Sequence, residues 1–135
     1  MIPQHSASII LSATDDALIG CAGFDADTAA KGGVIWLTRS LAAGMGKKGV
    51  RANAICPSFV STEPQLAWMK TDQAKTVMAA LHLLPIATPE QMAPFVVYLA
   101  SDESCVVTGG TFPIDSGYMA FKANLDVMGT VNPPA

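Results

Sequence analysis

The segment from Asp25 to Cys56 decides the fold, and it reads DADTAAKGGVIWLTRSLAAGMGKKGVRANAIC. From Asp25 to Met45 there is no proline, apolar residues recur at helical spacing, and glycines and lysines follow, which predicts a helix. Val50 to Cys56 predicts a strand that Pro57 ends, and the apolar run Ser8 to Ser12 predicts a buried strand before the helix. Strand, helix and strand in this order are typical of a parallel βαβ unit, so the predicted class is α/β.

The rest of the chain adds one helical pattern and one further strand. Residues 58–87 are mixed, with a predicted helix from Thr71 to Leu83, and are interpreted as a variable insertion of the kind that shapes substrate pockets. Thr88-Pro-Glu-Gln has the pattern of a capping box and predicts a helix to about Ser101. Thr111 to Ile114 predicts a third strand, which Pro113 places at a sheet edge or a bulge. Residues 119–135 are expected to form a C-terminal arm of this single domain.

Composition excludes several classes of protein. Half of the 135 residues are hydrophobic and 14% are charged, which fits one globular domain and excludes a disordered chain. A net charge of -3 without a basic stripe gives no support to nucleic-acid binding. No run approaches the roughly 18 apolar residues of a membrane span, and the N-terminus lacks the pattern of a signal peptide, so we expect a cytoplasmic protein. The three cysteines lack metal-ligand spacing, so we expect buried, reduced thiols and no metal site.

Several short motifs, taken in order, resemble one family. Residues 30–42 (AKGGVIWLTRSLA) and 50–57 (VRANAICP) are similar to the active-site helix and the following strand of short-chain dehydrogenase/reductase (SDR) enzymes. Pro89-Glu90 and residues 99–103, 108–110 and 115–118 are similar to that family's last helix and last strand. The resemblance runs from Ser8 to Tyr118 and implies the C-terminal half of an SDR. We therefore expect a truncated Rossmann-like fold, with a three-stranded parallel sheet and flanking helices.

The resemblance also implies a catalytic set, from which this chain departs. SDR enzymes have a Tyr four residues before the active-site Lys, so that the ammonium lowers the pKa of the phenol. With Lys31 as that lysine, Asp27 stands in place of the Tyr, and the family's Ser falls on Thr14, with Ser12 as a nearby substitute. We expect Asp27 to be an ionised partner of Lys31 that cannot replace the phenol as a proton donor.

The cofactor pattern of the family is not found in this sequence. Residues 44–49 spell GxGxxG, but these glycines end the predicted helix and lead into a strand, whereas a phosphate cradle follows a strand and opens a helix. The resemblance leaves only Thr62 as a residual contact of the cofactor wall. We expect the dinucleotide-binding half to be missing and no cofactor to bind, with NAD(P) entering only if a second chain supplies that half.

Four carboxylates precede Lys31, the first basic residue: Asp15, Asp16, Asp25 and Asp27. Helix capping and solubility explain them without a function. Alternatively, the loop after the first strand folds back and gathers several of them with Thr14 and Lys31 in one cleft, where they serve acid–base chemistry or hold a cation. The sequence leaves this open. His5 and His82 are expected at the surface.

Three functional hypotheses follow. In the first, the chain has oxidoreductase ancestry but no independent NAD(P)-dependent activity. In the second, it is a non-redox enzyme, a hydrolase, isomerase or lyase, that acts on a small molecule with Asp27, Lys31 and either Thr14 or Ser12. In the third, it is a non-catalytic module for binding or oligomerisation. Because an exposed sheet edge and uncovered apolar surface are avoided in natural proteins, we expect a homo-oligomer, either a dimer or a tetramer.

Overall fold

The computed structural model describes residues 1–120 and has one parallel sheet of three strands. The strands are β1 (Ala7–Ser12), β2 (Val50–Pro57) and β3 (Thr111–Ile114), in the order β1-β2-β3, with Ala7 opposite Val50 and Ala54 opposite Thr111. Five residues of the central strand are buried: Val50, Ala52, Asn53, Ala54 and Cys56. The predicted α/β class and the three-stranded parallel sheet are confirmed.

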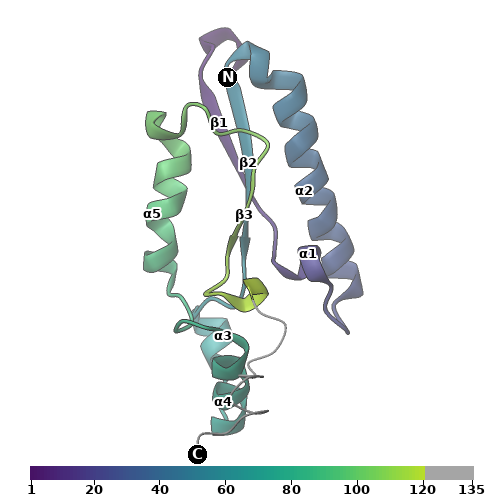
Figure 1. Cartoon of the computed structure of the whole chain (residues 1–135), viewed down its shortest axis with the longest axis vertical. Helices are drawn as coiled ribbons and strands as arrows, with labels where there is room; N and C mark the ends of the chain where they lie inside the picture. Colours follow the sequence, from purple (N-terminus) through teal and green to yellow (C-terminus); the bar gives the residue numbers. More distant parts are fainter. Residues whose placement is uncertain (121–135) are drawn as a thin grey trace, which may run out of the picture.

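Helices cover both faces of the sheet, as Figure 1 shows. Helix α2 (Asp25–Met45) lies along one face with the short α1 (Asp16–Ile19) beside it, and α5 (Pro89–Ala100) lies along the other. The bounds of α2 are those predicted from the sequence. Ile35 of this helix packs with Ala13 and Cys56 to form the hydrophobic core on its side of the sheet.

Helix α5 is fixed at both of its ends by side chains. At its start the predicted capping box is present, because the Thr88 hydroxyl accepts from the backbone N–H of Gln91 and the Gln91 side chain accepts from the N–H of Thr88. At its end the Arg51 guanidinium donates to the carbonyls of Leu99 and Ser101, both at 3.0 Å. These carbonyls have no partner within the helix, so Arg51 joins the end of α5 to the central strand.

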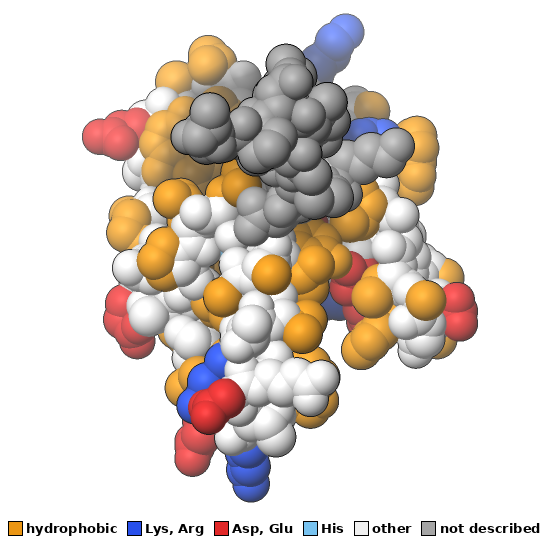
Figure 2. Space-filling model, turned by 60° about the horizontal axis from the view of Figure 1, so that its bottom comes forward, with side chains coloured by type: hydrophobic (Ala, Val, Ile, Leu, Met, Phe, Trp, Pro, Cys, Tyr) orange, Lys and Arg blue, Asp and Glu red, His pale blue; other side chains and the backbone are white. Residues whose placement is uncertain are grey.

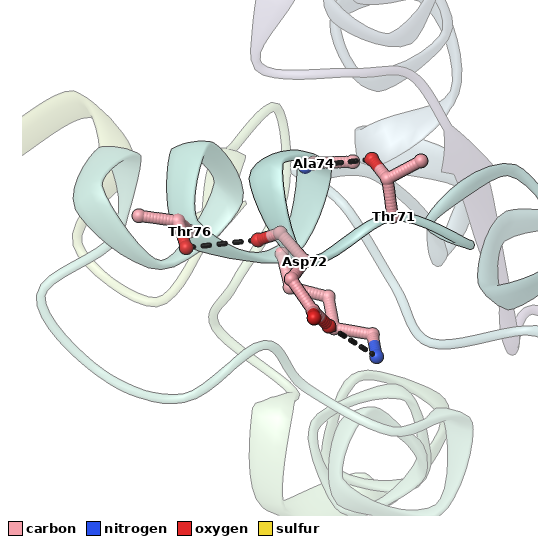
Figure 3. Close-up of polar contacts among 5 residues, drawn as sticks. Thr71, Asp72, Ala74 and Thr76 are labelled. Atoms are coloured by element: carbon pink, nitrogen blue, oxygen red, sulfur yellow. Dashed lines mark hydrogen bonds and ion pairs between the residues drawn. The ribbon is translucent and has the colours of Figure 1, made fainter.

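The segment 58–87 forms two helices, which lie beyond the carboxyl ends of the strands (Figure 1). Helix α4 (Asp72–Leu81) was predicted, whereas the short α3 (Glu63–Trp68) was not. The start of α4 is held by three local contacts (Figure 3): the Thr71 hydroxyl accepts from Ala74 N at 3.1 Å, Thr76 donates to the Asp72 carbonyl, and Lys75 pairs with the Asp72 carboxylate.

The remaining predictions on the fold concern the end of the chain. β3 is a terminal strand of the sheet, and this confirms the edge position inferred from Pro113. Of the predicted C-terminal arm, residues 121–135 lie outside the described part. Short 3-10 turns complete the structure at Ile2–Gln4, Gly46–Lys48, Asp102–Ser104 and Tyr118–Ala120. No helix within residues 1–120 is long and apolar enough to cross a membrane.

Candidate functional site

A cavity of about 570 Å³ lies where the carboxyl ends of β1 and β2 meet the segment 58–87. In Figure 2 this end of the molecule comes forward, and hydrophobic side chains gather around a hollow in it. The aromatic part of the cavity wall comes from Phe24, Phe59, Trp68 and Tyr118. Polar residues of the wall come from the loops that follow the two strands, from the first turns of α1 and α2 and from the end of α4. They include Thr14, Asp15, Ser58, Asp16, Asp27 and His82. In open α/β sheets, ligand sites are found at this edge.

The loop after β1 folds back along β2 and so brings its polar residues into the cavity. Ala13 N donates to the Ile55 carbonyl at 2.8 Å, and Asp15 N donates to the Pro57 carbonyl at 3.1 Å. Of the four carboxylates singled out in the sequence, Asp15, Asp16 and Asp27 line the cavity, but Asp25 is not among the lining residues. The convergence that the sequence left open is therefore present for three of the four.

The predicted catalytic residues are only partly brought together. Thr14 and Asp27 line the same cavity, and Thr14 Oγ1 lies 3.2 Å from Asp15 Oδ1. The Ser12 side chain is exposed, and neither Ser12 nor Lys31 is among the lining residues. Lys31 Nζ instead donates to the backbone carbonyl of Ser12 at 3.1 Å.

The expectation that Asp27 and Lys31 form an ion pair was wrong. Within residues 1–120 the one ion pair is Lys75–Asp72, at 3.4 Å. The physical reason is competition for the ammonium. Asp27 is exposed at the start of α2, where an ion pair gains little because both charges are well hydrated, whereas the Ser12 carbonyl at the end of β1 offers a fixed acceptor.

Asp15 is the most buried carboxylate of the cavity, at 2% exposure. Its Oδ1 accepts from the Asp16 N–H at 2.9 Å, and its Oδ2 is buried with no hydrogen-bond partner among the described residues. Burial raises the pKa of the Asp15 carboxyl, the Ser58 hydroxyl nearby opposes this, and the charge of Asp16 raises it further. Burial also raises the pKa of Asp16. The cavity therefore holds carboxyl groups that retain protons more readily than exposed ones.

Replacing Asp15 with Asn is expected to stabilise the protein at neutral pH. The pKa of Asp15 is higher in the folded state than in the unfolded state, where a carboxyl titrates near pH 4. The wild type therefore loses stability as the pH rises above about 4 and through the folded-state pKa. Asn keeps the Oδ1 acceptor and has no charge to bury. Thermal unfolding should give equal melting temperatures below pH about 4 and a higher value for Asp15→Asn at pH 7.

The matched control for that substitution is Asp25→Asn, because Asp25 is exposed at the start of α2 and does not line the cavity. It should show no gain at pH 7. A lower melting temperature for Asp15→Asn than for the wild type at pH 7 would contradict the assignment of a buried, disfavoured charge.

Two residues of the cavity were missed by sequence reasoning. His82 is 5% exposed, so the surface position expected for it was wrong. It follows α4, and its ring lies 5.3 Å from the ring of Tyr118. Ser58 Oγ is 3.0 Å from His82 Nε2. The position of Ser58 directly after β2 was a usable signal, because that is where sites form on a parallel sheet, but no pattern in the sequence brings His82 beside it.

The GxGxxG segment lies where the sequence placed it. Gly44 is in the last turn of α2, Gly46 begins the 3-10 turn, and Gly49, with φ of +77°, precedes β2. A Cβ on Gly49 would collide with the backbone of His5, so only glycine allows the two backbone segments to lie this close together. The order helix, glycines, strand is the reverse of a phosphate cradle. Thr62 precedes α3 and is not among the residues that line the cavity.

The cysteines and metal-ligand groups complete the description of the site. All three cysteines are free, but only Cys56 is buried, because Cys21 is half-buried in the cavity wall and Cys105 is exposed. The expectation that all three thiols are buried was therefore wrong for Cys105. No cluster of three or more His, Cys, Asp or Glu side chains that could hold a metal ion occurs within residues 1–120.

Comparison with known proteins assigns the chain to a family. A family model described as "Enoyl-(Acyl carrier protein) reductase" matches residues 1–119. The 2-(S)-hydroxypropyl-CoM dehydrogenase 3 of Xanthobacter autotrophicus is 37% identical over 125 residues, which are 89% of this chain and 49% of that protein. The chain belongs to the short-chain dehydrogenase/reductase family.

Other SDR relatives and solved structures agree with this assignment. The 3-oxoacyl-(acyl-carrier-protein) reductase of Thermotoga maritima is 32% identical, over 87% of this chain and 47% of that protein. The structure of a putative gluconate dehydrogenase from Agrobacterium tumefaciens superposes with a TM-score of 0.85 at 26% identity, covering 90% of this chain and 48% of that one. The chain spans about half the length of the SDR relatives it matches.

Proposed function

We propose that this chain forms the substrate-binding side of an SDR-type protein, and that its own residues do not carry out NAD(P)-dependent carbonyl reduction. The observation that carries the proposal is that Asp27 lines one cavity with Thr14; counted from Lys31, Asp27 is the residue at the spacing expected for the family's Tyr. Carboxyl groups ordinarily titrate near pH 4 and phenols near pH 10, so at neutral pH an exposed carboxylate is a base or a ligand and not a proton donor.

The residues present do not fit a nicotinamide dinucleotide. A pyrophosphate is held by backbone N–H groups at a helix N-terminus that follows a strand, with glycines at the turn. Here the turn after β1 carries Asp15 and Asp16, whose carboxylates oppose a phosphate, and the glycine-rich segment precedes β2. Thr62 alone does not replace the cradle. We therefore infer that NAD(P) chemistry needs nucleotide-binding residues other than those of residues 1–120.

Asp27 variants test this proposal. The wild type and Asp27→Tyr are each incubated with NADPH or NADH and a panel of aldehydes and ketones, and cofactor oxidation is followed by absorbance. Neither is expected to exceed the buffer rate, because Asp27→Tyr restores the phenol but not the cofactor site. Carbonyl reduction that appears in Asp27→Tyr without a partner chain would overturn the proposal.

A second candidate is a non-redox enzyme that uses Asp27 as base and Thr14 as hydrogen-bond donor. The observation that favours it is that both residues line a cavity with an apolar wall, large enough for a small molecule. Lys31 and Ser12, which were included in this hypothesis, do not line the cavity. If screening finds a hydrolase, isomerase or lyase activity, Asp27→Asn should abolish it while the fold is retained, and an unchanged rate would remove Asp27 from the mechanism.

We also propose that the chain forms a homodimer or homotetramer. In the described part, β1 is a terminal strand with one side unpaired, and the outer face of α2 exposes Trp36 at 68%, with the Arg39 guanidinium 4.5 Å from the centre of its ring. Exposed aromatic side chains and Arg are enriched in interfaces. Sedimentation velocity at micromolar concentration should show an oligomer that Trp36→Glu weakens, and a wild-type monomer would contradict the proposal.

A further inference from the structure

We propose that Ser58 and His82 form a nucleophile–base pair that hydrolyses acyl esters with an apolar acyl chain. Ser58 follows β2 directly and His82 follows α4 directly, so two separate elements deliver them to the same cavity. Ser58 Oγ lies 3.0 Å from His82 Nε2, which is within the range for activation of a hydroxyl by imidazole. This activity is independent of Asp27 and of any nicotinamide cofactor, and so goes beyond the function proposed above.

The hydrogen bonds of His82 fix the direction of proton transfer. Its Nδ1 lies 2.7 Å from the backbone carbonyl of Met78, which can only accept, so Nδ1 carries the proton. In the neutral ring Nε2 is then the acceptor, and the Ser58 hydroxyl donates to it. A base whose second nitrogen is held by a fixed acceptor is the arrangement found in serine hydrolases. Because His82 is 5% exposed, its ring is also held in place by packing.

The surroundings of the pair define the substrate class. Beside Ser58 the cavity wall is apolar, with Phe59, Trp68 and Leu81, and this wall suits an acyl chain. Asp15 lines the same cavity and is buried, with its Oδ2 unpaired among the described residues. Burial and the charge of Asp16 raise the pKa of the Cys21 thiol, which makes it a poor competing nucleophile.

The reaction needs only water as co-reactant. Ser58 Oγ attacks the ester carbonyl carbon while its proton passes to His82 Nε2. Collapse of the tetrahedral intermediate breaks the bond to the alcohol oxygen, and the departing alcohol takes the proton from His82. Water then attacks the acyl-serine with His82 as base, which releases the carboxylic acid and restores the Ser58 hydroxyl. No electrons leave the substrate, so no oxidant or reductant is required.

Hydrolysis of p-nitrophenyl butyrate and octanoate by the full chain tests the proposal. Ser58→Ala and His82→Gln should each lower kcat/KM at least about 100-fold, which is the usual contribution of a nucleophile or a general base. The matched control is Ser61→Ala, because Ser61 lies in the same loop, bonds to the Ala87 carbonyl and does not line the cavity. Its rate should stay within about twofold of the wild type, with circular dichroism confirming the fold of each variant.

A second measurement uses the wild type alone and does not depend on the folding of variants. The chain is treated with a fluorophosphonate and digested, and the labelled peptide is identified by mass spectrometry. The expected adduct is on Ser58. Hydrolysis that persists in Ser58→Ala, an adduct confined to other residues, or a folded wild type that neither hydrolyses the esters nor takes the label would overturn the proposal.

Discussion

Asn53→Ala is expected to lower the free energy of unfolding by about 3 kcal/mol, because each buried group that loses its partner costs about 1–3 kcal/mol. Asn53 lies in the central strand and is fully buried. Its Nδ2 donates to the Val107 carbonyl at 2.9 Å, and its Oδ1 accepts from Gly110 N at 3.0 Å. One side chain thus fixes the turn that connects α5 to β3. Alanine would leave Gly110 N without its partner and the Val107 carbonyl with only the longer contact from Arg51, at 3.5 Å.

Urea unfolding followed by circular dichroism measures this loss. Asn53→Asp serves as a partner variant, because it keeps an acceptor for Gly110 N but removes the donor to Val107 and buries a charge, so it should be at least as unstable. The control is Gln73→Ala on the exposed side of α4, which should change stability by less than about 0.5 kcal/mol. A loss below about 1 kcal/mol for Asn53→Ala would show that the turn is held by other contacts.

The sequence was sufficient to predict the elements that have strong local signals. The bounds of α2 followed from a long proline-free pattern ended by glycines and lysines, and the start of α5 followed from its capping box. Helix α3 was missed because it has six residues, too few for a periodic pattern. Its last residue, Trp68, packs on Phe59, with ring centres 5.9 Å apart, and such a contact between separate segments leaves no trace in local sequence.

The candidate site likewise has residues that the sequence could indicate and residues that it could not. The spacing of the family pattern singled out Thr14 and Asp27, and both line one cavity, whereas their catalytic roles stay a prediction. The partner of Lys31 could not be predicted, because helical spacing allows a pair with Asp27 while the choice of the Ser12 carbonyl depends on where β1 ends beside α2. The burial of His82 involves contacts with Ser58 and Tyr118, which lie far from it in the chain, and local sequence does not encode such contacts.

The largest expected effect is the failure of this chain to bind NADH or NADPH on its own. The dinucleotide carries a charged pyrophosphate, whose binding needs backbone N–H groups and positive potential at a helix start. The two helices that follow β1 open with carboxylates instead, at Asp15 and Asp16 for α1 and at Asp25 for α2. The ammonium of Lys31, which the sequence resemblance leads us to expect at the family's active-site position, donates to the Ser12 carbonyl instead. We therefore expect a Kd no tighter than about 1 mM, which corresponds to only about 4 kcal/mol of binding free energy.

Titration of the purified chain with NADH and with NADPH, followed by nicotinamide fluorescence, tests the central claim most directly. Excitation of the tryptophans adds a second signal, because Trp68 lines the cavity and would transfer energy to a nicotinamide bound there. The predicted result is a linear rise in fluorescence with cofactor concentration and no energy transfer. Saturable binding at micromolar concentration, with energy transfer from tryptophan, would contradict the account and show that these residues hold the cofactor without a second chain.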